Sequence, residues 1–205
     1  MFESKFIVLD GPDGCGKSTQ VRLLGQHIAS AGVEVVCFRD PGSTVIGEKI
    51  RDILLDTGNK AMADRTELLL YMAARAQLYS ECIAPALKKG CCVILDRWVT
   101  STCAYQGFAG GVGVDTVIDI AGHSLERLWP DVTVILDVDL EVSASRMKRT
   151  LDRMEQKGDS YHGKVREGFL QLAKIRDDVV VVDAKDSVEQ VEANVIKAVE
   201  STILL

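Results

Sequence analysis

Short runs of consecutive apolar residues alternate along the chain with longer stretches in which the apolar residues have helical spacing. An unbroken apolar run is typical of a strand buried on both faces, because a strand with one wet face alternates apolar and polar positions. The runs predict five strands, at residues 6–9, 34–38, 91–95, 132–138 and 179–182. The helical spacing predicts helices at residues 17–31, 45–55, 67–87, 114–129 and 188–199, the third bent near Pro85.

The alternation of strand and helix predicts an α/β fold, with a five-stranded parallel sheet and helices on both of its faces. Any ligand is then expected beyond the carboxyl ends of the strands. The chain contains no linker rich in proline or serine and no internal repeat, so residues 1–205 are expected to form a single domain. Residues 68–74 are apolar on nearly every side, which predicts a helix that is buried or shared with a partner subunit.

Composition and charge narrow the class of protein. The 205 residues are 47% hydrophobic and 26% charged, which is typical of a globular domain and excludes a mainly disordered chain. No apolar run has the length of a membrane span and the first residues do not resemble a signal peptide, so a cytoplasmic protein without a membrane partner is expected. The net charge of -6 disfavours a nucleic-acid partner. The six cysteines lack the spacing of a zinc site and are expected to be reduced thiols.

A glycine-rich loop follows the first predicted strand and precedes the first predicted helix. Its sequence fits the pattern G-x-x-x-x-G-K-[ST]. Glycines allow successive backbone N–H groups to point at a phosphate, and the start of the following helix adds its positive dipole end. Lys17 can reach the outer phosphates, and the hydroxyl of Ser18 can ligate Mg²⁺. The loop therefore predicts an ATP-binding site that contains Gly11, Pro12, Asp13, Gly14, Cys15, Gly16, Lys17, Ser18 and Thr19.

A carboxylate ends the third predicted strand. Asp96 follows the apolar run 91–95 and is therefore expected at the edge of the sheet where the phosphates would lie. An acidic residue in this position helps to hold the magnesium ion of P-loop enzymes. Ser18 and Asp96 are thus the predicted metal-binding residues, with Mg²⁺ as the cofactor and ATP as the co-substrate.

Four further segments place arginine beside aromatic or polar residues: 39–42 (RDPG), 67–77 (ELLLYMAARAQ), 96–107 (DRWVTSTCAYQG) and 151–155 (LDRME). Arginine can bind phosphate oxygens through two parallel hydrogen bonds, and aromatic faces stack on bases. Together with the glycine-rich loop, these segments make the chain resemble the thymidylate kinase family from Phe6 to about Val199. Three positions depart mildly from the family pattern: Trp98 replaces the more frequent Tyr, Asp40 lies in a loop that usually carries Glu, and Ser43 replaces a second Gly.

The resemblance implies a bacterial-type P-loop nucleoside monophosphate kinase that transfers the γ-phosphoryl group of ATP to dTMP, giving dTDP and ADP in dTTP biosynthesis. It also implies a homodimer and a three-layer fold with a short helical lid at about residues 146–166. Tyr71 would stack on the thymine ring, Arg75 would hydrogen-bond its exocyclic oxygen, and Tyr105 would pack under the sugar. The dTMP-binding residues that the resemblance implies are Asp13, Arg39, Tyr71, Arg75, Arg97, Thr102, Tyr105 and Gln106, while Arg146 and Lys185 would extend the ATP site.

Basic residues gather in the lid segment (146–166). Seven Lys and Arg residues stand there against three acidic ones, a net charge of +4 in a chain of -6. Such a segment is often only a solvated helix face. Because the glycine-rich loop carries no arginine, the resemblance implies that lid arginines neutralise the transferring phosphoryl group. The implied catalytic residues are Lys17, Arg97, Arg149, Arg153 and Asp13, with Arg146 in support.

Three other functions remain open at this stage. The acceptor could be dUMP or another nucleoside monophosphate, because one methyl group in an apolar pocket changes binding by only about 1–3 kcal/mol. A nucleoside kinase would need a carboxylate placed to activate a sugar hydroxyl. The Asp96–Trp98 segment and the lid argue against this function. A nucleotide-binding module without enzymatic activity would not need the metal, phosphate and base-stacking residues together.

Overall fold

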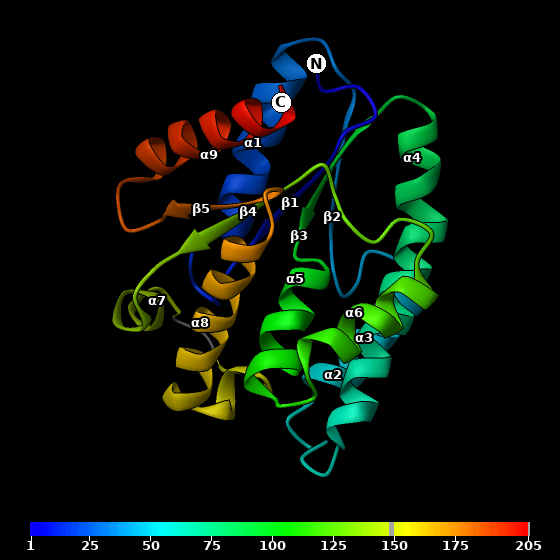
Figure 1. The fold of residues 1–205 in the computed structure, drawn as a ribbon, viewed down its shortest axis with the longest axis vertical. Helices are drawn as coiled ribbons and strands as arrows, with labels where there is room; N and C mark the ends of the chain where they lie inside the picture. The colour runs from blue at the N-terminus through cyan, green and yellow to red at the C-terminus, as the bar shows by residue number, and fades with distance from the viewer. Residues whose placement is uncertain (148–149, 205) are drawn as a thin grey trace.

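In a computed structural model that describes residues 1–147 and 150–204, five strands form one parallel sheet in the order β2–β3–β1–β4–β5. Every predicted strand is present, with ends that differ by at most one residue from the expected ones. The parallel sheet with helices on both faces is therefore confirmed (Figure 1). The strands are β1 (Phe6–Asp10), β2 (Val35–Arg39), β3 (Cys92–Asp96), β4 (Val132–Asp137) and β5 (Val179–Asp183).

Two helices cover one face of the sheet. Helix α1 (Lys17–Ser30) packs on β1, β2 and β3, and α9 (Val188–Ile203) packs on β4 and β5. Leu24 and Ile28 of α1 lie in one apolar cluster with Val195 of α9 and the inward side chains of the strands. The strands β1 and β4 are buried along nearly their whole length, which explains why their sequences are unbroken apolar runs.

The helices of the opposite face include the long predicted helix 67–87, which is divided into three parts. Helix α3 (Asp64–Leu78) continues into a π-helical turn, η1 (Tyr79–Ile83), and then into α4 (Ala84–Lys88). The irregular turn thus precedes Pro85, a residue without an N–H to donate, in the first turn of α4. Helix α2 (Val45–Leu55) has the predicted bounds, α6 (Val114–Ser124) ends earlier than predicted, and α9 ends later.

Several helical elements were not predicted. Helix α5 (Val99–Thr102) passes into a π-helical segment, η2 (Cys103–Ala109), and α8 (Asp159–Ile175) packs against η2. Val165 and Phe169 of α8 are buried against this segment. The lid segment contains the end of α7 (Leu140–Arg146), a 3₁₀ turn, η3 (Glu155–Lys157), and the first half of α8. Within the described residues, no helix is both long and apolar enough to cross a membrane.

Candidate active site

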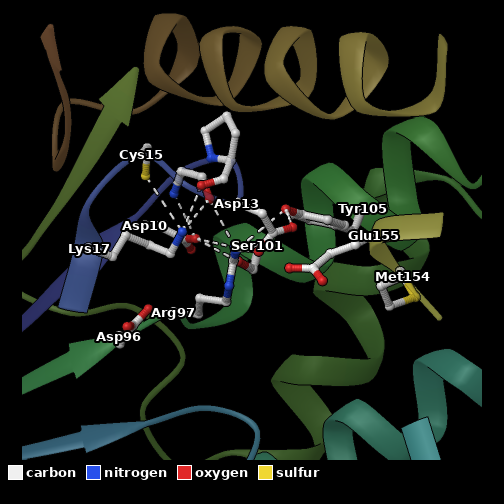
Figure 2. A network of polar contacts seen from close by, with 12 residues as sticks. Asp10, Asp13, Cys15, Lys17, Asp96, Arg97, Ser101, Tyr105, Met154 and Glu155 are labelled. Carbon is white, nitrogen blue, oxygen red and sulfur yellow. Dashed lines mark hydrogen bonds and ion pairs between the residues drawn. The ribbon is translucent and has the colours of Figure 1, made fainter. Parts of the chain in front are cut away.

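The glycine-rich loop joins β1 to α1 at the carboxyl edge of the sheet, as predicted (Figure 2). Lys17 is 7% exposed, and its ammonium donates to the carbonyl oxygens of two loop residues, Gly11 at 3.1 Å and Pro12 at 2.7 Å. A side chain at Gly11 would collide with the carbonyl oxygen of Leu136 in β4, so only glycine fits where the loop crosses the sheet edge. The ammonium of Lys17 therefore bridges two backbone carbonyl groups of the loop.

Asp96 and Ser18 meet beside this loop. The Ser18 hydroxyl donates to Oδ2 of Asp96 at 2.8 Å, so the end of β3 and the first turn of α1 bring one hydroxyl and one carboxylate together. These are the hard oxygen ligands that Mg²⁺ prefers, and the ion commonly takes only one or two protein ligands beside substrate phosphates and water. The predicted metal-binding pair therefore fits magnesium.

Asp13, Arg97 and Tyr105 form a connected polar network (Figure 2). Arg97 Nη2 lies 2.6 Å from Oδ1 of Asp13, and the Tyr105 hydroxyl donates to Oδ2 of the same carboxylate at 2.8 Å. Partial burial alone would raise the pKa of Asp13, but the charges of Arg97 and Lys17 and the Tyr105 hydrogen bond outweigh it and hold this pKa well below its usual range. Burial raises the pKa of Tyr105, so its hydroxyl stays protonated and donates.

The backbone of Arg97 has a φ of 74°, a left-handed conformation that non-glycine residues rarely adopt. This turn directly follows β3 and points the guanidinium back toward β1, where Nη1 donates to the carbonyl oxygen of Gly11 at 2.9 Å and to Ser101 Oγ at 2.9 Å. A residue held in such a conformation is typical of a functional site, where surrounding contacts offset a strain of about 1–3 kcal/mol.

Asp10 is a site residue that the sequence analysis missed. It ends β1, is fully buried, and accepts hydrogen bonds from Thr100 Oγ1 at 2.5 Å, Ser101 Oγ at 2.5 Å and the backbone N–H of Gly11 at 2.9 Å. It therefore ties the start of the glycine-rich loop to α5. A charged residue at the end of an otherwise apolar strand was the available signal.

Two cavities adjoin at this edge of the sheet. The larger, of about 810 Å³, extends over the glycine-rich loop, and the smaller, of about 90 Å³, lies between α2, α3 and η2. Asp13 and Arg97 line both cavities, and so do Asp40 and Arg51. Of the predicted residues, the larger cavity brings together Asp13, Gly14, Cys15, Gly16, Lys17, Ser18, Thr19, Arg39, Asp96, Arg97 and Arg146, and the smaller one Asp13, Tyr71, Arg75, Arg97, Thr102, Tyr105 and Gln106.

Some predicted residues lie elsewhere. Lys185 lines neither cavity: its ammonium pairs with Asp183 at 2.6 Å, and its side chain is 64% exposed. Arg39 lines the larger cavity, not the smaller one that was expected to hold the acceptor, and pairs with Glu48 at 2.8 Å. Arg149 lies outside the described residues.

Arg153 is not brought to the glycine-rich loop. Its Nη1 lies 2.6 Å from Oε2 of Glu67 in α3, its Nε donates to the carbonyl oxygen of Leu54 at 2.7 Å, and it lines neither cavity. The reason is electrostatic, because Glu67 is buried and attracts the nearest cationic side chains of the lid segment. A role of Arg153 at the phosphoryl group would require it to leave Glu67.

The sequence analysis also missed Arg51 and Glu155. Arg51 lines both cavities, and its Nη1 donates to the carbonyl oxygen of Pro41 at 2.9 Å. Glu155 is 6% exposed, lines the larger cavity, and accepts from the backbone N–H of Asp152 at 3.0 Å. Arg51 is one charged residue on a helix with polar neighbours, so its spacing alone gave no signal.

The glycine-rich loop lies under the larger cavity, the smaller cavity adjoins it, and Arg97 lines both. This arrangement defines a P-loop kinase that acts on a small phosphorylated acceptor. Comparison with known proteins agrees with this class. Residues 9–195 match the family model described as thymidylate kinase. The chain belongs to the thymidylate kinase family.

Individual relatives support the same assignment over nearly the whole chain. The thymidylate kinase of Thermosipho africanus is 42% identical over 196 residues, which cover 95% of this chain and 97% of the relative. That of Symbiobacterium thermophilum is 45% identical over 202 residues, 98% of this chain and 94% of the relative. A crystal structure of thymidylate kinase from Ehrlichia chaffeensis superimposes with a TM-score of 0.78 at 30% identity, and the match covers 96% of this chain and 98% of that one.

Proposed function

We propose that the larger cavity binds ATP, that the smaller cavity binds dTMP, and that the γ-phosphoryl group passes between them beside Arg97 and Asp13. The reaction follows from the family: the protein is a kinase that transfers the γ-phosphoryl group of ATP to dTMP, giving dTDP and ADP in dTTP synthesis. One observation carries the assignment of the cavities. Arg97 and Asp13, joined at 2.6 Å, line both of them, so donor and acceptor would meet at this pair.

The donor phosphates would lie on the glycine-rich loop. Its backbone N–H groups and the start of α1 favour negative charge, and the ammonium of Lys17 can exchange its two carbonyl partners for phosphate oxygens. Ser18 and Asp96 would hold Mg²⁺, which when bound neutralises charge on the β- and γ-phosphates. Arg146 lines the same cavity and is held by the carbonyl oxygen of Ala184 at 3.0 Å.

The acceptor nucleotide would lie between α3 and η2. Tyr71 would stack on the thymine ring, Arg75 would donate to its exocyclic oxygen, and Thr102 and Gln106 would border the remaining edge. Tyr105 would pack under the sugar and leave little space for a ribose 2′-hydroxyl. Thr102 Oγ1 has no hydrogen-bond partner within the described residues and is fully enclosed, so the Thr102 side chain would have to rotate for this hydroxyl to meet a ligand atom.

Transfer would depend on alignment and charge, not on a general base. The acceptor is a phosphate monoester that is largely ionised at neutral pH, and the site offers it cationic groups from Arg97 and Lys17. Arg146 would act from the lid segment in this structure, whereas Arg153 would first have to leave Glu67. Closure of the lid segment would exclude the water that could otherwise hydrolyse ATP.

The experiment that tests this proposal measures ADP release from Mg-ATP with a panel of acceptors: dTMP, dUMP, dCMP, dAMP, dGMP, UMP and thymidine. A strong preference for dTMP over the other acceptors is expected. Preference for another monophosphate would retain the donor site and reject the acceptor assignment. Activity with thymidine alone would reject the reaction itself.

We also propose that the chain is one domain that forms a homodimer in the cytoplasm. Helices α2 and α3 pack on each other and expose Ile46 at 50%, Ile53 at 46% and Leu69 at 55%, an apolar surface that a second copy could cover. The six cysteines are free thiols, as a reducing compartment requires. Sedimentation velocity at low micromolar concentration should give twice the chain mass of 22.4 kDa, and a monomer at that concentration would reject the dimer.

A further inference from the structure

Glu67 is a buried carboxylate inside a helix that is otherwise largely apolar on its inner side. It lies one helical turn before Tyr71 in α3 and is 2% exposed. Gln106 Nε2 donates to its Oε1 at 2.9 Å, and two cationic groups of the lid segment surround it, Arg153 at 2.6 Å and Lys157 at 3.1 Å. A buried charge is retained only when it is paired and hydrogen-bonded, so these contacts explain how the carboxylate is tolerated.

The contact with Glu67 determines which way the side-chain amide of Gln106 faces. A glutamine amide has one end that donates and one that accepts, whereas an ionised carboxylate can only accept. Burial alone would raise the pKa of Glu67, but the Gln106 hydrogen bond and the charges of Lys157 and Arg153 outweigh it and lower this pKa below its usual value. At neutral pH Glu67 is therefore ionised, and the nitrogen of the Gln106 amide has to face it.

The oxygen of the same amide is left without a protein partner beside the smaller cavity. Gln106 is 3% exposed and lines that cavity. None of the described residues donates to its Oε1, and this oxygen is not among the fully enclosed unpaired atoms, so it keeps accessible surface on a residue that lines the cavity. The site therefore presents a fixed acceptor to whatever base occupies it.

We propose that Glu67 is a specificity-determining positioning residue, which fixes the Gln106 amide so that its carbonyl oxygen selects a pyrimidine with an N–H at ring position 3. This inference rests on the proposed binding of dTMP in the smaller cavity. Thymine and uracil carry a hydrogen at N3 and satisfy the oxygen of Gln106. Cytosine carries a lone pair at N3, so two acceptors would face each other without a proton between them.

Two matched acceptors test this inference: dTMP and 5-methyl-dCMP, which share the methyl group, the sugar and the phosphate. The variant is Glu67→Gln, because a neutral amide at position 67 can accept from or donate to Gln106 and no longer fixes its orientation. The ratio of kcat/KM for dTMP to that for 5-methyl-dCMP should fall by about tenfold, which corresponds to one hydrogen bond of ordinary strength. The change should lie mainly in the two KM values.

A merely structural role of Glu67 would lower the activity with both acceptors alike and leave the ratio unchanged, which would overturn the inference. Lys157→Met is the matched control: it removes one charge beside Glu67 and keeps the bond to Gln106, so the wild-type ratio is expected. An equal fall in Lys157→Met would assign the effect to charge instead and also overturn the inference. If Glu67→Gln folds poorly, the double variant with Lys157→Met restores the charge balance and should show the same fall in ratio.

Two reference measurements separate this inference from the proposed function. Gln106→Leu should lose discrimination at least as strongly as Glu67→Gln, and an unchanged ratio would overturn the inference because it depends on Gln106. Wild-type protein without activity on dTMP would reject the proposed function, and the inference with it. Wild-type activity on dTMP with an unchanged ratio in Glu67→Gln would overturn the inference alone.

Discussion

The ion pair between Asp40 and Arg75 allows a prediction about both stability and recognition. Arg75 Nε lies 2.6 Å from Oδ2 of Asp40, and the two side chains are 1% and 0% exposed. Arg75 also donates to the carbonyl oxygen of Trp98 at 3.2 Å, and its guanidinium lies 5.3 Å from the centre of the Trp98 ring. The substitution Arg75→Met removes the positive charge and leaves the carboxylate buried.

The expected loss of stability is large. Removing one partner of a buried ion pair costs about 3–5 kcal/mol, because the remaining charge is neither solvated nor paired. Asp40 fits this case closely, since its other oxygen, Oδ1, already has no partner within the described residues. The loss is a sizeable part of the roughly 5–15 kcal/mol that stabilises a typical domain. The double variant Arg75→Met with Asp40→Asn should regain about 1–3 kcal/mol, because no buried charge remains.

The assay is urea unfolding of four proteins: wild type, Arg75→Met, Asp40→Asn and the double variant. The same proteins are titrated with dTMP. The double variant should regain stability without regaining dTMP affinity, because Arg75 lines the smaller cavity and its donor to the base is still missing. A loss below about 1 kcal/mol in Arg75→Met would refute the reasoning about the buried pair. Recovery of dTMP binding in the double variant would refute the base-contacting role of Arg75.

Three further outcomes are expected. Lys17→Met should abolish turnover and keep the wild-type circular dichroism spectrum; turnover near the wild-type rate would reject the donor site. Asp13→Asn should lower the stability most at neutral pH. Arg97 and other contacts lower the pKa of Asp13 in the folded protein, so the contribution of Asp13 to stability is full above about pH 5 and is lost as the pH falls through the folded pKa. Urea midpoints measured from pH 7 down to about pH 2 give the difference, and a loss that stays equal over this range would contradict the sign. Ser43 has a φ of 64°, and its hydroxyl accepts from the backbone N–H of Arg39 at 2.9 Å. Ser43→Ala should therefore lose about 1–2 kcal/mol of stability, while Ser43→Gly, which tolerates this φ, should stay within about 1 kcal/mol of wild type. Equal thermal midpoints for the two variants would contradict this expectation.

The sheet and the phosphate loop could be predicted from the sequence because both depend on local signals. An unbroken apolar run specifies a buried strand, and the glycine, lysine and serine spacing of the loop has one structural meaning between a strand and a helix. Helix α8 carried a usable signal as well, since Val165, Phe169 and Leu172 recur on one face and are buried. The many basic residues of this region obscured its apolar stripe.

The polar partners within the site could not be predicted in the same way, because they come from distant parts of the chain. Glu67 is one of several charged residues in α3, and its partners Gln106, Arg153 and Lys157 lie 39 to 90 residues away. No periodicity links such residues. The placement of Arg153 illustrates the difficulty: the motif indicates a functional arginine, but which of several carboxylates or phosphates it binds depends on the packing of α3 against the lid segment.

The π-helical segment η2 has a consequence for how this site could change. A wide turn accommodates one additional residue in a helix, and every side chain beyond it is rotated by about 100° from the direction that regular winding would give. Tyr105 and Gln106 lie within this turn, while Thr102, the last residue of α5 before it, keeps ordinary helical angles. Deletion of one residue here would straighten the winding, leave α5 in place and turn these two side chains away from the cavity. The chain thus contains a point at which a change in length, without any change of side chain, would replace the groups that face the ligand.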